Sequence, residues 1–460
     1  MKNVHESILD CIGNTPMVRL RKVTAGLKCT VYAKVEFFNP AGSIKDRVAK
    51  QIVEDYEAEG VLKEGGMLVE GTSGNTGAGL ALMAADRGYS ATFVMPDKQS
   101  EEKRAALRAW GAKVVITPTD VAAEDPRSYY KVSERLVREN ENACYANQYH
   151  NPSNPKAHYL STGPEIWDQL DGKIDVFFAG VGTGGTISGT GAFLKEQNKD
   201  VQVVGIDPVG SLFYDYFHSG VMTKPYTYVL EGIGEDFLPT TVDFSSVDDI
   251  IRVNDKECFE MTRRLVREEG IFAGASCGAA VAGALKYLQR HDREGMVAVI
   301  ILPDSGKNYL SKVFNDRWME ENRFLEPDTN TGTVADLIKH KGKGALVKIE
   351  AKTKVSNAIS ILKDGGISQA PVMKGNKLLG ILSEKTLLHR ALQGDPRQEK
   401  IESLIDLDFC VVHGDTEIVV LTELFARYKV ALLFEGKEGP KDIITRIDLI
   451  DYMASQKRRK

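Results

Sequence analysis

Short apolar runs alternate with longer stretches of helical period between residues 31 and 302, and this alternation restricts the fold more than any other feature of the sequence. The runs at 31–37, 91–95, 113–117 and 296–302 have the length and composition of buried strands, whereas 45–59 repeats its apolar residues at helical spacing. Strands that alternate with helices are typical of a parallel sheet covered by helices. We therefore predict an α/β fold for this region.

A change of composition marks a domain boundary. With 460 residues, the chain is long enough for two or three folded units. Residues 326–332 form a polar run that is rich in turn-forming residues. We therefore predict a linker at 326–333, which joins a domain at 1–325 to a second domain at 334–460.

The second domain contains a weak internal repeat. Thr353 and Ser383 recur as Thr416 and Thr445, at spacings of 63 and 62 residues. Two similar units of this size are typical of a tandem module. We place the two units at about residues 334–395 and 400–455.

Charge and composition exclude several classes of protein. The chain carries 59 basic and 64 acidic residues, and its net charge of -5 offers no general attraction for nucleic acid or an anionic membrane. Residues 176–194 lack charge but contain six glycines, which leaves too little continuous apolar surface for a membrane span. The first residues lack a signal-peptide layout, and the six cysteines show no C-x-x-C spacing. We expect a cytoplasmic protein without a metal, and no nucleic acid or membrane partner.

A glycine-rich segment at residues 180–185 satisfies G-x-G-x-x-G between a predicted strand and a helix. Backbone N–H groups in such a loop can surround phosphate oxygens, and the following helix adds its positive end. Asp207, 22 residues beyond Gly185, mimics the ribose-binding acid of a dinucleotide fold, so a nicotinamide-dependent dehydrogenase is one interpretation. A plain strand-to-helix turn without a ligand is another.

A second loop, residues 70–77, is crowded with hydroxyl groups and one amide. Its hydroxyl and N–H groups suit a small carboxylate at the start of a helix, and Asn75 can also donate to a phenolic oxygen of a cofactor. An ordinary helix N-cap is the alternative.

Lys45 lies in the first turn of a predicted helix, where its positive charge opposes the helix dipole. One interpretation is a solvated lysine that is balanced by Asp46. The other is an amine that forms a Schiff base with a carbonyl cofactor, as pyridoxal phosphate enzymes require.

Four segments, at 42–47, 72–77, 182–186 and 274–278, resemble in order and spacing those of the β-replacement pyridoxal phosphate enzymes. This family includes cysteine synthase and cystathionine β-synthase, and the match spans residues 6 to about 316. The resemblance implies the two-lobed, parallel-sheet fold of type II pyridoxal phosphate enzymes, with pyridoxal 5'-phosphate as the cofactor.

The resemblance also implies roles for individual residues. It makes Lys45 the Schiff-base lysine and the acid/base of the reaction, Asn75 the partner of the phenolic oxygen, and Ser276 the hydroxyl at the pyridine nitrogen. The implied phosphate-binding residues are Gly182, Thr183, Gly184, Gly185 and Thr186. The implied substrate-binding residues are Thr72, Ser73, Thr76, Gln148, Tyr149, Gly232 and Glu235.

Two features favour the cystathionine β-synthase branch over cysteine synthase. Residues 231–239 resemble the G-I-G-Y-D-F-x-P segment of that branch, although Glu235 replaces the usual tyrosine and leaves open how the second substrate is held. The C-terminal repeat resembles a tandem CBS-motif (Bateman) module of α+β structure, which cysteine synthases normally lack.

In such modules, a Thr and an Asp of the second repeat hold the ribose of an adenosyl ligand such as S-adenosylmethionine, and they match Thr445 and Asp448 here. The first repeat has Thr386 in place of the acid, so we expect at most one nucleoside site. A module that only mediates dimerisation is the alternative.

The implied activity is that of a carbon–oxygen lyase, which condenses L-serine, or an activated serine, with L-homocysteine to give L-cystathionine. Cysteine in place of serine would release hydrogen sulfide. A cysteine synthase that uses O-acetylserine and sulfide is the alternative within the family. Animal members carry a haem-binding segment ahead of the core, which begins here by Glu6, so we expect no haem. The family further implies a homodimer or a larger homo-oligomer.

Overall fold

The computed structural model describes residues 4–72, 74–97, 101–118, 121, 125–325, 332–342, 344, 346–436 and 439–457. They form two compact units. Unit 1 comprises the described parts of Met1–Pro208, Val229–Gly234 and Leu238–Glu326, and unit 2 those of Val209–Tyr228, Glu235–Phe237 and Pro327–Lys460. No helix in the described ranges is long and apolar enough to cross a membrane.

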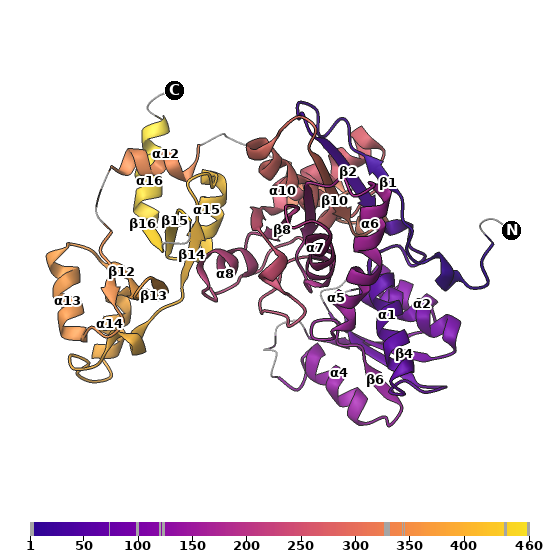
Figure 1. The fold of residues 1–460 in the computed structure, drawn as a ribbon. Helices are drawn as coiled ribbons and strands as arrows, with labels where there is room; N and C mark the ends of the chain where they lie inside the picture. Colours follow the sequence, from indigo (N-terminus) through magenta and orange to yellow (C-terminus); the bar gives the residue numbers. More distant parts are fainter. Residues whose placement is uncertain are drawn as a thin grey trace. The chain divides into compact units, whose positions relative to one another are not determined.

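Unit 1 contains two sheets that are covered by helices (Figure 1). The larger has the order β1-β2-β10-β7-β8-β9, and only β1 runs antiparallel to its neighbour. The smaller has four parallel strands in the order β5-β4-β3-β6. The strands of the larger sheet are β1 (Met17–Arg19), β2 (Thr30–Val35), β7 (Val176–Gly180), β8 (Gln202–Pro208), β9 (Asp249–Val253) and β10 (Val297–Leu302). Those of the smaller sheet are β3 (Met67–Gly71), β4 (Ser90–Pro96), β5 (Lys113–Thr117) and β6 (Ala143–Tyr145).

The helices of unit 1 connect these strands and cover the sheets, as parallel strands require. They are α1 (Lys45–Ala58), α2 (Asn75–Arg87), α3 (Glu101–Ala109), α4 (Tyr129–Arg138), α5 (Ser153–Ala157), α6 (Gly163–Gln169), α7 (Gly185–Gln197), α9 (Asp255–Arg264), α10 (Ala275–His291) and α11 (Asp316–Glu321). Shorter helical turns are η1 (Ile8–Cys11), η2 (Glu36–Phe38), η3 (His158–Thr162), η4 (Phe244–Ser246), η5 (Leu265–Glu269) and η6 (Gly306–Tyr309). The predicted α/β fold is confirmed.

Burial explains why β10 has no polar residue. Its sequence Val-Ala-Val-Ile-Ile-Leu lies between β2 and β7, and every position after the first is buried. A strand that is covered on both faces requires apolar side chains in both directions, so it shows a continuous apolar run instead of alternation. In the smaller lobe, α1 and α2 pack against each other, and their apolar faces share one core with β3 and β4.

The prediction for β2 was wrong at its end. The apolar pattern indicated a strand over 31–37, but β2 ends at Val35 and the chain turns into η2. Glu36 is fully buried here and binds Arg47, a partner on α1 that a strand pattern cannot indicate. A tertiary ion pair therefore overrides the local preference for extended backbone.

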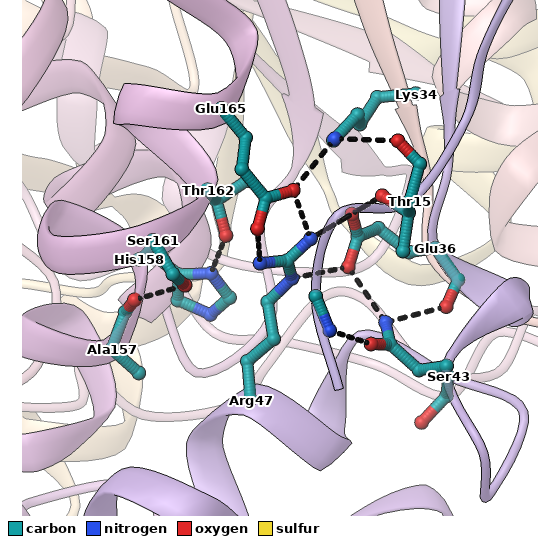
Figure 2. Close-up of polar contacts among 12 residues, drawn as sticks. Thr15, Lys34, Glu36, Ser43, Arg47, Ala157, His158, Ser161, Thr162 and Glu165 are labelled. Atoms are coloured by element: carbon teal, nitrogen blue, oxygen red, sulfur yellow. Dashed lines mark hydrogen bonds and ion pairs between the residues drawn. The ribbon is translucent and has the colours of Figure 1, made fainter. Parts of the chain in front are cut away.

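A buried ion cluster joins α1 to β2 and α6 (Figure 2). The Arg47 guanidinium lies between two carboxylates, with Nε 2.7 Å from Glu36 Oε2 and Nη1 2.6 Å from Glu165 Oε1. Lys34 Nζ lies 2.8 Å from Glu165 Oε2, and the Thr15 hydroxyl donates to Glu36 Oε1 at 2.6 Å. Two cations thus face two carboxylates in a site from which water is largely excluded, since the Lys34 and Arg47 side chains are 0% and 2% exposed.

The same contacts control the protonation of Glu165. Burial raises its pKa, but the hydrogen bonds and charges of Arg47 and Lys34 outweigh burial and hold the pKa at about 2. Because this value lies below the ordinary pKa of glutamate, about 4.3, the carboxylate stabilises the fold above that pH. The contribution is lost as the pH falls towards 2.

Unit 2 contains two three-stranded sheets of the same topology. In each, the first strand is parallel to the second and the second is antiparallel to the third, with an irregularity at Val372/Met373 in one and at Leu433/Phe434 in the other. The first sheet has β11 (Ile349–Glu350), β12 (Gln369–Lys374) and β13 (Lys377–Ser383), and the second β14 (Phe409–Val412), β15 (Val430–Phe434) and β16 (Pro440–Thr445). The helices are α12 (Val334–Lys341), α13 (Val355–Asp364), α14 (Glu384–Ala391), α15 (Ile418–Arg427) and α16 (Arg446–Lys457), with the turn η7 (Ile401–Leu404).

The first helix of this region does not pack within its own half. Val334 and Leu337 of α12 belong to the same hydrophobic core as Ile418 and Leu421 of α15. The interval 334–395, predicted as the first repeat, therefore contributes its first helix to the core of the second sheet. The predicted domain and repeat bounds themselves stay a prediction.

Unit 2 also includes α8 (Phe213–Ser219), which lies far from the repeats in sequence and against β14 in space (Figure 1). Asp215 of α8 is buried and accepts the Val411 N–H at 3.0 Å and the Thr223 hydroxyl at 2.9 Å. The Tyr428 hydroxyl donates to the carbonyl of Lys224. Residues 209–228 are thus built into the repeat region by a buried carboxylate and by apolar packing.

We expect Arg47→Leu to lower the free energy of unfolding by about 3–5 kcal/mol, because Glu36 and Glu165 would keep their buried charges without a cation. Arg317→Leu is the control, since Arg317 forms an exposed pair with Glu321 on α11 and its loss should cost less than about 1 kcal/mol. Urea unfolding measured by circular dichroism compares the two. Equal losses would contradict a structural role of the buried cluster.

Candidate active site

The loops with the sequence motifs of unit 1 follow the carboxyl ends of parallel strands. The loop that contains Thr72 follows β3, the glycine-rich loop follows β7, and Asp304 follows β10. Ligands of open α/β sheets bind at such edges, where several loops converge. β7 and β10 are neighbours in the larger sheet, so the loops that follow them lie side by side. The loop after β3, which belongs to the smaller sheet, reaches them through a hydrogen bond between Asn75 and Asp304.

The glycine-rich loop forms a tight cradle at the start of α7. Gly184 has φ +82°, and a Cβ at Gly185 would lie 1.9 Å from Asn154 Oδ1. Asn154 Nδ2 donates to Thr183 Oγ1 at 2.9 Å, and the helix begins at Gly185 with its N–H groups towards the loop. Only glycine fits these positions, so the loop leaves its backbone accessible to an anion at a positive helix end.

Asp207, which suggested a dinucleotide fold, does not lie where a ribose-binding acid would have to lie. Asp207 lies within β8 and is 0% exposed. A ribose-binding acid requires a carboxylate that a ligand can reach, which a fully buried strand residue does not offer. This geometry favours a phosphate cradle that belongs to another cofactor class.

Lys45 is the first residue of α1 and is half-buried. Its backbone N–H donates to the Ser43 hydroxyl at 3.2 Å, and the N–H of Ile44 donates to the Pro303 carbonyl at 2.8 Å. Asp46, which we considered as its solvated counter-ion, is instead buried and accepts the Ala41 N–H at 2.6 Å. Burial raises the pKa of Asp46 to about 7, so the solvated-pair interpretation of Lys45 is wrong.

Asn75 opens α2 and binds a buried carboxyl group. Its Nδ2 donates to Asp304 Oδ2 at 2.9 Å, and the Tyr309 hydroxyl donates to the same oxygen at 2.6 Å. Burial raises the pKa of Asp304, while the hydrogen bonds of Tyr309 and Asn75 lower it. Sequence reasoning missed Asp304, although a Pro-Asp-Ser-Gly turn directly after a buried parallel strand is a signal that could have found it.

The predicted carboxylate-binding loop brings hydroxyl groups close to Gln148. The Thr72 hydroxyl accepts the N–H of Gly74 at 3.1 Å, and the Thr76 hydroxyl donates to Gln148 Oε1 at 2.5 Å. These three polar side chains are buried, and burial also raises the pKa of nearby Glu70 to about 8. Ser73, predicted for the same loop, lies outside the described residues.

Ser276 lies in the buried first turn of α10, beside Gly232. A Cβ at Gly232 would lie 3.6 Å from Ser276 Oγ, and a Cβ at Gly182 would lie 3.0 Å from the Gly232 carbonyl. Gly232 has φ +92°, a conformation that favours glycine. The segment at 231–234 is thereby brought between the pyridine-nitrogen candidate and the phosphate loop.

A buried histidine, also missed from the sequence, contacts the phosphate loop through Thr186 and lies near the ion cluster (Figure 2). His158 Nε2 lies 3.3 Å from Thr186 Oγ1, and its Nδ1 lies 2.9 Å from Thr162 Oγ1. Burial, with smaller contributions from the charges of Lys45 and Arg47, lowers its pKa well below the ordinary value. A neutral imidazole therefore accompanies the cradle at neutral pH.

Two lysines meet one carboxylate next to this loop system. Glu231 forms ion pairs with Lys103 of α3 and with Lys312. Burial raises the pKa of Glu231, but the charge of Lys103 and the hydrogen bonds of both lysines outweigh burial and bring the pKa below its ordinary value. The carboxylate therefore stays ionised. No motif in the sequence indicated this group, because its members come from three distant segments.

The remaining predicted residues are divided between the two units. In unit 1, the Tyr149 carbonyl accepts the Thr241 hydroxyl at 3.0 Å, and this hydroxyl also contacts the Thr183 carbonyl of the glycine-rich loop. Glu235 belongs to unit 2, where its backbone pairs with Ser211 and Leu212, while Gly232 belongs to unit 1. Thr445 and Asp448 lie in unit 2 at the start of α16.

The residues in unit 1 fit pyridoxal phosphate. The glycine cradle can take a phosphate, while an amine, an amide N–H and a hydroxyl at Lys45, Asn75 and Ser276 match the other polar atoms of the cofactor. Asp304 connects these groups, since it binds Asn75 and forms a β-bridge with Ser43 of the Lys45 segment, and its carbonyl accepts the N–H of Gly274 beside Ser276. Among the described residues, no group of three His, Cys, Asp or Glu side chains could hold a metal ion.

Comparison with known proteins gives this site a family. A family model described as pyridoxal-phosphate dependent enzyme matches residues 8–304, and one described as CBS domain matches residues 322–392. Cystathionine β-synthase of Dictyostelium discoideum is 37% identical, over 100% of this chain and 94% of its own length. The enzymes of the same name from Rattus norvegicus and Saccharomyces cerevisiae are 36% and 35% identical, over 98% and 97% of this chain and 86% and 98% of their own lengths.

Solved structures resemble the N-terminal part. O-ureido-L-serine synthase has 38% identity and a TM-score of 0.63, over 69% of this chain and 99% of its own. A hydrogen sulfide-producing enzyme from Fusobacterium nucleatum has 35% identity and a TM-score of 0.62, over 67% of this chain and 100% of its own. The predicted family, the type II fold and a pyridoxal phosphate enzyme are confirmed, and the chain belongs to the cystathionine β-synthase family of pyridoxal-phosphate dependent enzymes.

Proposed function

We propose that the chain condenses L-serine with L-homocysteine to give L-cystathionine and water, or an activated serine with L-homocysteine to give L-cystathionine and the activating group as its free acid. The observation that carries this proposal is the alignment of cystathionine β-synthases over both parts of the chain, including the C-terminal region that the similar solved synthases do not cover. The contacts around Asp304 and the glycine cradle support the same proposal, because they connect the segments that carry the proposed cofactor-binding residues.

The proposed division of labour follows from residue chemistry. Bound pyridoxal phosphate would supply the electron sink that makes the Cα proton of an amino acid removable. The Thr72 and Thr76 hydroxyls and Gln148 bind the carboxylate of the first amino acid and fix its orientation. The Lys45 amine takes the proton from Cα and delivers a proton to the departing β-hydroxyl, which leaves as water. The homocysteine thiol then gives its proton to the Lys45 amine as its sulfur adds at Cβ, and Lys45 delivers that proton to Cα.

A second candidate is favoured by the similar solved structures. Their names describe a serine-derivative synthase and a hydrogen sulfide-producing enzyme, and both match the catalytic region at more than 30% identity. A chain that uses O-acetylserine and sulfide would therefore fit the same loops. Release of hydrogen sulfide from cysteine is compatible with either candidate, because cysteine also carries a leaving group at Cβ.

Four finer points belong to the proposal. The C-terminal module binds an adenosyl ligand such as S-adenosylmethionine, the chain forms a homodimer or larger homo-oligomer, it works in the cytoplasm, and it holds no haem. The proximity of Thr445 and Asp448 is compatible with the first point, since the N–H and hydroxyl of Thr445 both lie 2.7 Å from Asp448 Oδ2 at the start of α16. The visible spectrum of the pure protein and its sedimentation test the haem and the oligomer.

Lys45→Ala should abolish both turnover and the visible absorption of the bound cofactor, because no other amine of the site is expected to attach it. Lys50→Ala, on the same helix, is the control and should leave both unchanged. Absorption spectra and a cystathionine assay measure the two effects. A variant that keeps its visible band and its turnover would refute the role of Lys45, and binding of a nicotinamide cofactor instead would support a dehydrogenase.

The substrates can be separated by measuring kcat/KM for serine and O-acetylserine, each with homocysteine and with sulfide. We expect the highest value for serine with homocysteine. Glu235→Gln should raise KM for homocysteine by up to about ten-fold, as expected if its carboxylate pairs with the ammonium group of the second amino acid. Sulfide has no ammonium group, so its KM should not change, and an equal effect on both would contradict this role.

Asp448→Asn should weaken binding of S-adenosylmethionine by about 10–100-fold, because a charged acceptor for the ribose hydroxyls is lost. Asp336→Asn is matched for helix capping, since Asp336 accepts the N–H and hydroxyl of Thr333 at 3.1 and 3.0 Å at the start of α12. Titration calorimetry compares the variants. Equal weakening would indicate a capping effect, and no binding by the parent chain would favour a module for dimerisation alone.

A further inference from the structure

Asp304 lies where three of the four motif segments meet. It forms a β-bridge with Ser43 of the Lys45 segment, its carboxyl accepts Asn75, and its carbonyl accepts the N–H of Gly274 at 3.0 Å. The Cys277 thiol also donates to this carbonyl, at 3.3 Å. The side chain is almost completely buried, with 1% exposure of the residue. A polar residue in such a place contributes to the arrangement of all three segments.

The hydrogen bonds of Asp304 determine which atoms of the Asn75 amide face the site. Asp304 Oδ2 receives two donors, Asn75 Nδ2 at 2.9 Å and the Tyr309 hydroxyl at 2.6 Å. An oxygen that receives two donors acts as an acceptor, whether or not the proton of the carboxyl group resides on Oδ1. Oδ1 lies against Gly274, where a Cβ would approach it to 2.0 Å, and has no hydrogen-bond partner among the described residues.

The orientation of the Asn75 amide is therefore fixed by Asp304 and Asn308. One of its two N–H groups is taken by Asp304, and its Oδ1 lies 3.5 Å from the Nδ2 of Asn308. An amide has two N–H groups and one carbonyl oxygen, so this arrangement leaves an N–H, and not the carbonyl, for a bound group. A side chain at position 304 that can both donate and accept hydrogen bonds would not impose this orientation on the Asn75 amide.

We propose that Asp304 is a positioning residue, which acts through Asn75 to keep an amide N–H directed at the phenolic oxygen of the cofactor. This inference rests on the proposed function, since it assumes that Asn75 faces that oxygen. An N–H donor stabilises the ionised phenolic oxygen, and the carbonyl of a flipped amide would repel it. Asp304 would thus set the ionisation of the bound cofactor without contacting it.

Several ionisable groups surround Asp304 and would contribute to any pH titration of the bound cofactor. Tyr309 of η6 and Asn75 of α2 donate to the carboxyl, Lys103 of α3 lowers its pKa, and Glu231 raises it. Cys277 of α10 contacts its carbonyl, and burial raises the pKa of this thiol far above its ordinary value. Spectra are therefore compared at one fixed pH near neutrality for every variant.

The test is the ratio of the visible absorption band of the bound cofactor, with an ionised phenolic oxygen, to its near-ultraviolet band, with a neutral one. Asp304→Asn should lower this ratio by about five-fold, the value of one hydrogen bond, because an asparagine can donate as well as accept. Asn75→Ala should lower it by a similar factor. In the double variant the two effects should not add, since Asp304 acts through Asn75.

Tyr309→Phe is the matched control, because it removes the other donor to the same oxygen and leaves the contact with Asn75. Its ratio should stay within about two-fold of the parent value. Each variant is checked for folding by its thermal midpoint, and Asp304→Ser, with the same expected fall, replaces Asp304→Asn if the latter does not fold. An unchanged ratio, additive effects, or an equal fall in Tyr309→Phe would overturn the proposal. If the parent chain showed no absorption band of the cofactor at all, the proposed function would be refuted instead.

Discussion

A single buried guanidinium holds the catalytic half of the molecule together. Arg47 lies two residues after Lys45 on α1, and its contacts with Glu36 and Glu165 attach that helix to η2, directly after β2, and to α6. Since ions without partners are costly in the interior, α1 has little freedom to turn or slide against the large sheet. The orientation of Lys45 is therefore a consequence of charges that lie below the site, and the Ala41 N–H bond of Asp46 closes the loop that precedes it.

Local patterns predicted the strands well where burial alone decides their sequence. β5 has the predicted bounds, and β10 starts only one residue later than predicted, because each is a short apolar or β-branched run. The prediction over 31–37 was too long, because Glu36 leaves the strand to meet Arg47. The strands β1, β6 and β9 were missed. The first two have only three residues, too few to form a recognisable pattern, and β9 includes two charged residues, Asp249 and Arg252, that interrupt its apolar run.

The residues of the site also fall into those that a local sequence pattern indicates and those that it does not. Motifs indicated Lys45, Asn75, the glycine cradle and Ser276, because each role requires a particular residue type at a particular place in a loop. His158 and Glu231 could not be found in that way, since each acts through partners that lie far away in the sequence. Asp304 had a signal in the turn after β10, but its contact with Asn75 is likewise a long-range one. Their importance depends on burial and on donor–acceptor pairing, and both are properties of the folded chain.

The position of residues 209–228 in unit 2 has a consequence for engineering. Val209 and Tyr226 belong to the same apolar core as the second repeat, so a cut after unit 1 at the linker would uncover them. A shortened chain would combine the loss of the module with a newly exposed apolar surface, and its properties would not report the module alone. An exchange of modules between family members must accordingly include this internal segment together with the C-terminal repeats, because the two form one complementary pair.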